Sequence, residues 1–95
     1  MSDLDPLFNE MTQTLRDARQ AVGDNFEVHK ITRDPDALRH LAAADHSFAE
    51  QAGCLLNVMV NRDPRNPRIS EVEDLLDFFR QFEKLIGAAA GEGRR

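Results

Sequence analysis

Three stretches of the chain place apolar residues at alternating steps of three and four. This spacing puts the apolar side chains on one face of an α-helix and is typical of helices that pack side by side at a shallow angle. The three seams are Phe8, Met11, Leu15, Ala18 and Val22; Leu38, Leu41, Asp45, Phe48, Ala52, Leu55 and Met59; and Val72, Leu75, Phe79, Phe82 and Ile86. The pattern therefore predicts an all-α chain with three helices.

Helix start signals precede each of these stretches. The Asp-Pro pairs at 5–6 and 34–35 each place a favourable N-cap residue before a proline at the first helical position. Ser70 followed by Glu73 matches a capping box, in which a hydroxyl and a carboxylate satisfy free backbone amides. These signals predict where the three helices begin.

Helix stop signals follow each stretch. They are Gly23, Asn61 before the proline-rich run RDPRNPR, and Gly87. Together, the start and stop signals predict helices at about 6–22, 35–61 and 70–86. Residues 24–33 are predicted to form either an irregular connector or an extended strand, because Phe26 and Val28 alternate with polar residues.

The predicted lengths and connections suggest an architecture. The connection at 62–69 is short, so the second and third helices should form an antiparallel hairpin. The central helix would be about 40 Å long and the others about 25 Å, which leaves its apolar C-terminal end, CLLNVMV, partly uncovered. We therefore expect an antiparallel three-helix bundle with a long central helix that forms a homodimer. Residues 1–87 would be a single domain and residues 88–95 a flexible tail.

The net charge and the composition exclude several classes of function and location. The 95 residues carry a net charge of −5, which argues against nucleic-acid and anionic-membrane binding. No apolar run approaches the length of a transmembrane span, and the acidic N-terminus lacks the basic start of a secretory signal. A single cysteine cannot form an internal disulfide. These features predict a cytoplasmic protein with no membrane partner.

The sequence offers little support for catalysis, a metal or a cofactor. His40 and His46 lie about 120° apart around a helix, so they cannot share one ion. Cys54 follows Gly53 and precedes Leu55, which predicts a small core residue at a close helix contact, not a reactive thiolate. We therefore predict no catalytic residue, no metal ligand and no cofactor.

Asp45 is the one carboxylate in the seam of the central helix. A buried carboxylate is costly unless it has a partner. Either the seam is rotated, so that Ala44 faces inward and Asp45 meets solvent, or Asp45 pairs with Arg16 or Arg19 of the first helix and fixes the helix register.

The turn NRDPRNPRISE is the strongest candidate for a functional surface. It carries three arginines, spaced three residues apart, in an otherwise acidic chain, and two prolines stiffen the loop and hold the guanidinium groups apart. The arginines could bind carboxylates or phosphates of a partner, or could pair locally with neighbouring acidic residues. With the apolar end of the central helix, the candidate partner-binding residues are Arg62, Arg65, Arg68, Leu56, Met59 and Val60.

From Asn61 to about Leu76, this Pro-x-x-Pro turn between helices resembles the turn of type III secretion needle subunits. The resemblance covers neither the first helix nor the C-terminal half of the chain.

Three functions follow from these observations. The favoured one is a non-enzymatic bacterial interaction protein: an accessory subunit, small chaperone or regulator that binds another protein through an apolar helix face. The second is a structural or assembly subunit that uses the arginine-bearing turn. The third is a small enzyme or metal-binding protein that uses His40, His46 or Cys54.

Overall fold

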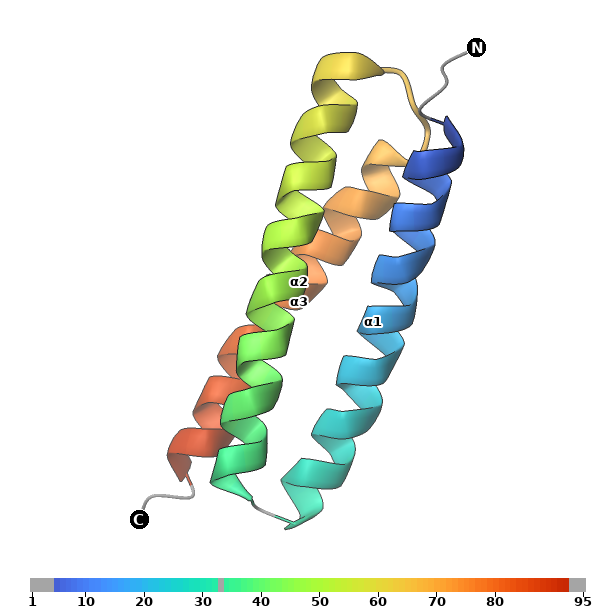
Figure 1. Cartoon of the computed structure of the whole chain (residues 1–95). Helices are drawn as coiled ribbons and strands as arrows, with labels where there is room; N and C mark the ends of the chain where they lie inside the picture. Colours follow the sequence, from blue (N-terminus) through green and yellow to red (C-terminus); the bar gives the residue numbers. More distant parts are fainter. Residues whose placement is uncertain (1–4, 33, 93–95) are drawn as a thin grey trace.

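The computed structural model of the chain describes residues 5–32 and 34–92, and they form three helices packed together. The helices are α1 (Asp5–Thr32), α2 (Pro35–Arg62) and α3 (Ile69–Glu92). In the view of Figure 1 the chain descends along α1, returns along α2 and descends again along α3. The molecule is a rod of 54 × 17 × 16 Å. The described residues contain no strand, so the all-α prediction is confirmed for this part of the chain.

The first helix is longer than predicted. α1 does not end at Gly23 but continues through the predicted connector to Thr32. The reason is that Phe26, four residues after Val22, extends the buried stripe by one turn. Its ring meets Phe82 edge-on, with 5.0 Å between the ring centroids. Both predictions for residues 24–33, an irregular connector or a strand, are therefore wrong within the described residues.

The third helix also continues past its predicted end at Gly87, as far as Glu92. Ile86 is fully buried, and Ala89 and Ala90 pack against the core. The small side chains after Gly87 thus continue a packed face. The prediction of a flexible tail at 88–95 is wrong for 88–92, and the last three residues lie outside the described part of the chain.

These extensions change the proportions of the bundle. α1 and α2 each have 28 residues and α3 has 24, so the central helix is as long as α1 and only one turn longer than α3. The apolar end of α2 is only partly covered within the chain: Leu55 is 2% exposed and Met59 is fully buried, whereas Val58 and Val60 remain exposed. The homodimer that we predicted from this helix end is not tested by the structure of a single chain and stays a prediction.

Side chains close the ends of α2. Asp34 is its N-cap, and its Oδ1 accepts hydrogen bonds from the backbone N–H groups of Asp36 and Ala37 at 3.1 and 3.2 Å. The following turn is braced by Asn66, which is 9% exposed. The Asn66 Nδ2 donates to Asp63 Oδ2 at 3.2 Å, and its Oδ1 accepts from the Arg68 N–H at 2.9 Å.

The start of α3 differs from the predicted capping box. α3 begins at Ile69, and the carbonyl of Arg68 accepts its first helical hydrogen bond, from the N–H of Val72 at 3.0 Å. Ser70 therefore lies inside the helix and is not its N-cap. The neighbouring Asn66, not the Ser70 hydroxyl, organises the turn into α3.

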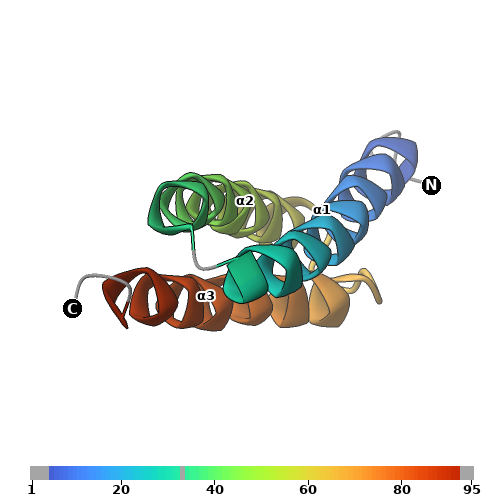
Figure 2. The same ribbon diagram turned by 90° about the horizontal axis from the view of Figure 1, so that it is seen from below.

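The core is a single apolar cluster between the three helices. Figure 2 shows α1 running obliquely past α2 and α3. Phe79 and Val72 of α3 are fully buried, and Phe48 of α2 packs on Phe79 with 5.7 Å between ring centroids. Burying a phenylalanine side chain contributes roughly 1.5–3 kcal/mol. α3 thus supplies the largest fully buried side chain of the α2–α3 contact, Phe79.

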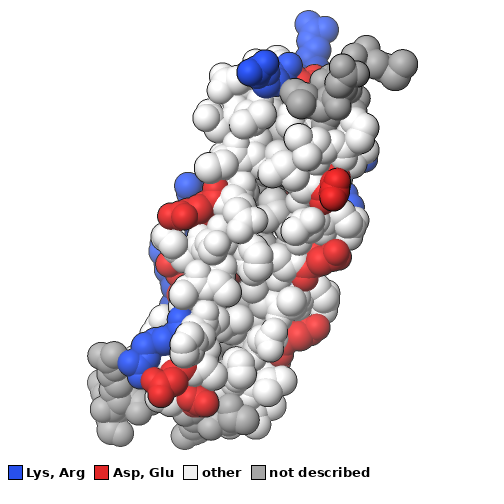
Figure 3. Space-filling view, in the orientation of Figure 1, with Lys and Arg blue, Asp and Glu red and all other residues white. Residues whose placement is uncertain are grey.

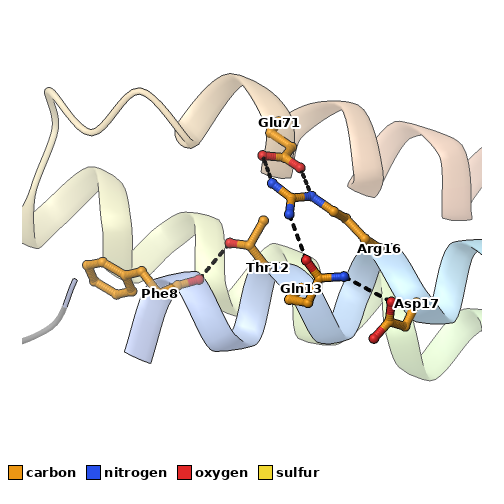
Figure 4. A network of polar contacts seen from close by, with 6 residues as sticks. All are labelled: Phe8, Thr12, Gln13, Arg16, Asp17 and Glu71. Atoms are coloured by element: carbon orange, nitrogen blue, oxygen red, sulfur yellow. Dashed lines mark hydrogen bonds and ion pairs between the residues drawn. The ribbon is translucent and has the colours of Figure 1, made fainter. Parts of the chain in front are cut away.

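A polar contact ties α1 to α3 at the rim of this core. Arg16 of α1 donates two hydrogen bonds to the carboxylate of Glu71 on α3, and Gln13 connects Arg16 to Asp17 (Figure 4). The hydrogen bond from Arg16 lowers the pKa of Glu71, and the charges of Arg16 and Arg68 act in the same direction. The two-point geometry fixes how α1 lies along α3.

Gly53 offers a test of the helix packing. Nothing lies within 4 Å of a Cβ placed at Gly53, so the predicted close helix contact there is wrong. Because Gly weakens a helix interior, we expect Gly53→Ala to stabilise the protein by about 1 kcal/mol and to raise its Tm by about 4–8 °C. Circular dichroism during heating measures this change. Ala43→Gly, on the exposed side of the same helix, should lower the Tm. A fall in Tm for Gly53→Ala would contradict the packing described here.

Candidate partner-binding surface

The three apolar candidates from the end of α2 differ in exposure. Met59 is fully buried and belongs to the core, so it presents no surface to a partner. Leu56 is half-buried and packs against the core. Val60 is 48% exposed. Of the three, Val60 has the largest surface available for a partner.

The three arginines of the turn also differ. Arg62 and Arg65 are exposed, and neither forms an ion pair with a residue that the structure describes. Arg68 is half-buried, and its charge helps to lower the pKa of Glu71. The turn therefore presents two outward guanidinium groups, and the third lies beside an acidic neighbour.

A more extended surface lies between α1 and α2, on the side facing the viewer in Figure 1. Leu7 and Met11 of α1 are 48% and 37% exposed, and Val58 of α2 is 43% exposed. A shallow hollow of about 80 Å³ lies here, lined by Met11, Thr14, Leu15 and Gln51. Its floor reaches the buried Leu15. An uncharged band runs along this face between acidic groups on either side, and basic groups lie at its upper end (Figure 3).

The apolar pattern of the sequence does not reveal this surface, because the pattern includes Met11 in the seam of the first helix. In the structure Thr12 is fully buried instead, next to Phe8 in the seam. The Thr12 hydroxyl donates to the carbonyl of Phe8 at 2.7 Å, so its burial leaves no unpaired polar group (Figure 4). Met11 is thereby turned toward the groove. The sequence did contain a signal for this burial: Thr12 lies four residues after the core residue Phe8, where its hydroxyl can bind the Phe8 carbonyl within the helix.

Asp45 is fully buried, and neither prediction for it is correct. It does not meet solvent, and neither of its carboxylate oxygens has a hydrogen-bond partner in the described structure. Arg16 binds Glu71, and Arg19 lies over the ring of Phe78 at 4.7 Å from its centroid. No arginine of α1 therefore neutralises this carboxylate.

The surroundings of Asp45 favour its protonated form. Burial raises its pKa to about 7, and the negative charge of Glu83 on α3 acts in the same direction. His46 opposes both effects. His46 lies 3.0 Å from Glu83 through Nδ1 and 3.1 Å from Glu50 through Nε2, so it bridges two carboxylates beside the buried one.

The remaining residues considered for an enzyme or metal site do not converge. Cys54 is exposed and is not the core residue that was predicted, because Ala52 and Leu55 occupy the buried positions on either side of it. His40 is exposed at the other end of α2. Within residues 5–32 and 34–92, no group of three or more His, Cys, Asp and Glu side chains is placed to hold a metal ion.

Asp45 makes stability depend on pH. Its pKa is about 7 in the folded protein, whereas an unperturbed aspartate has a pKa of 3.8, so the folded state keeps a proton that the unfolded state releases. Its contribution to stability is therefore full below about pH 4 and is lost as the pH rises to about 7. We expect Asp45→Asn, which has no charge to bury, to be more stable than wild type at pH 8 by about 2–4 kcal/mol.

Thermal melts at pH 5 and pH 8 measure this effect. The advantage of Asp45→Asn over wild type should be smaller at pH 5 than at pH 8. Asp77→Asn removes an exposed carboxylate of α3 and should leave the pH dependence of the wild type unchanged. A loss of stability at pH 8 in Asp45→Asn would mean that the carboxylate has a partner.

The chain was compared with known protein families, with curated proteins and with solved structures. None of the three comparisons finds a match. Within the described residues, no helix is both long and apolar enough to cross a membrane. Any function for this chain therefore has to be argued from its own surface.

Proposed function

We propose that this chain is a non-enzymatic interaction module that binds another protein through the exposed face between α1 and α2. It would serve as an accessory subunit, a small chaperone or a regulator in the cytoplasm. The observation that carries the proposal is the groove itself: Leu7, Met11 and Val58 are exposed beside a hollow whose floor is the core residue Leu15. Apolar side chains that border a groove are typical of protein-binding surfaces.

The arrangement of the helices suits this role. An antiparallel bundle of three helices leaves a groove between two of them that a further helix can fill. The band beside the groove carries no charge in Figure 3, so a partner can cover it without burying an ion.

A homodimer is a second form of the same proposal. Its original basis, an uncovered end of α2, applies only in part, because Leu55 and Met59 are buried within the chain while Val58 and Val60 are exposed. A dimer would use Val58 together with Leu7 and Met11 of α1. That surface would then be shared between two copies and closed to other partners.

Substitutions in the groove test the proposal. Met11→Asp with Val58→Asp places two charges on the face without disturbing the core, since both side chains are partly exposed. We expect the double variant to keep a Tm within a few degrees of wild type and to lose a partner that wild-type protein captures from the source cell. Leu85→Asp, at an exposed position of α3, should still capture it. Capture of the same partner by all three proteins would refute the proposal.

The turn supports a second candidate function, a structural or assembly subunit. Arg62 and Arg65 point outward from a turn that Asn66 holds rigid, and no described residue neutralises them. Such guanidinium groups can bind carboxylates of a neighbouring subunit at two points.

Replacing both of these arginines by alanine separates the candidates. Exposed charges contribute little to stability, so we expect the Arg62→Ala and Arg65→Ala double variant to keep its Tm within about 2 °C. If the turn mediates assembly, sedimentation should show that the variant no longer joins its complex. Unimpaired assembly would leave the groove as the only candidate surface. A marked fall in Tm would instead mean that these side chains stabilise the hairpin.

A further inference from the structure

The groove between α1 and α2 has an acidic edge on one side. Glu10, Asp17 and Asp24 lie at intervals of seven residues along α1, and all three are exposed. Seven residues are about two helical turns, or about 10.5 Å, so the three carboxylates follow one line over about 21 Å. Figure 3 shows acidic groups at intervals along one side of the uncharged band.

None of these carboxylates forms an ion pair within the described residues. Asp17 accepts a hydrogen bond from the neutral amide of Gln13 at 3.0 Å, and Asp24 accepts one from Gln20 at 3.1 Å. The charge of Asp17 helps to raise the pKa of Arg16, but the guanidinium of Arg16 binds Glu71. The negative charge of this edge is therefore available to a partner.

The helix surfaces that border the groove carry no charge. On α1 the row next to the carboxylates consists of Leu7, Met11, Thr14, Ala18, Ala21, Asn25 and Val28. On α2 the row through the groove residue Gln51 consists of Ala44, Ser47, Gln51, Cys54 and Val58. The positions alternate in steps of three and four, so each row follows one face of its helix. The groove thus combines an uncharged floor with a regular line of three carboxylates along its α1 edge.

We infer that the partner of this groove is an amphipathic helix that carries an apolar stripe and, along one edge, a lysine or arginine at every seventh residue. This inference rests on the proposed function and specifies the chemistry of the partner. The apolar stripe would lie on Met11, Leu15 and Val58, and the basic edge would face Glu10, Asp17 and Asp24. A helix in this position would complete a four-helix arrangement.

Charge distinguishes this partner from a second copy of the chain. A second copy has the same net charge of −5 and presents the same carboxylates beside the same groove. A basic helix gains favourable contacts at the edge, where each ion pair contributes little to affinity but helps to select the partner.

Two synthetic helical peptides test the inference. Both carry the same leucine stripe, and their edge positions are lysine in one and glutamate in the other. We expect the lysine peptide to bind about tenfold more tightly at low salt, as three exposed ion pairs allow, and the difference to shrink at high salt. Fluorescence anisotropy of labelled peptide measures both affinities.

Charge reversal on the protein locates the contact. We expect a triple variant to reverse the preference for the lysine peptide, so that the glutamate peptide binds more tightly. This variant carries Glu10→Lys, Asp17→Lys and Asp24→Lys. A matched control variant changes the net charge equally and should keep the preference for the lysine peptide. It carries Glu73→Lys, Asp74→Lys and Asp77→Lys on the exposed side of α3. Circular dichroism confirms that both triple variants remain helical.

The outcomes separate this inference from the proposed function. If both peptides bind equally and Met11→Asp with Val58→Asp abolishes both, the groove binds helices but the basic partner is wrong. The inference is also overturned if neither peptide binds, or if the protein dimerises through this groove and excludes the peptides. A preference that both triple variants lose to the same extent would reflect net charge alone and would likewise overturn it.

Discussion

The phenylalanine rings of α3 are the interaction on which the rest of the bundle depends. Phe79 packs on Phe48 of α2, and Phe82 meets Phe26 of α1. Phe78 contacts both Phe79 and Phe82 within α3. α3 thereby contacts both other helices through one continuous aromatic cluster. In a chain of this size the core is thin, so a few large side chains carry much of the buried apolar area. The position of α1, and with it the shape of the groove, follows from this cluster.

The sequence predicted the number and type of helices because the spacing of apolar residues is a direct consequence of helical geometry. It failed at the helix ends, because a glycine stops a helix only when no apolar residue beyond it can still be buried. Phe26 after Gly23 is buried, and Ala89 and Ala90 after Gly87 pack against the core, so both helices continued. Tertiary packing thus overrode the local signal. The longer α1 then removed the length mismatch between the first two helices, which was one of the grounds for predicting a dimer.

The candidate surface was less predictable, because exposure depends on the rotation of each helix by a fraction of a turn. A shift of one position buries Thr12 in place of Met11 and exposes Cys54, although both changes fit an amphipathic pattern. Asp45 was identified as unusual from its place in the seam. Its lack of a partner could not be predicted, because that depends on where Arg16 and Arg19 bind along α3. The spacing of residues within one helix does not predict such contacts between helices.

The aromatic content and the single thiol also determine how this protein can be observed. It contains neither tryptophan nor tyrosine, so it absorbs very little light at 280 nm. In a mixture, tryptophan fluorescence would come only from the other component. Cys54 is exposed, is the only cysteine in the chain, and lies on the row of α2 that borders the groove. A dye attached to this thiol would sit beside the proposed binding surface and could report occupancy without an engineered labelling position.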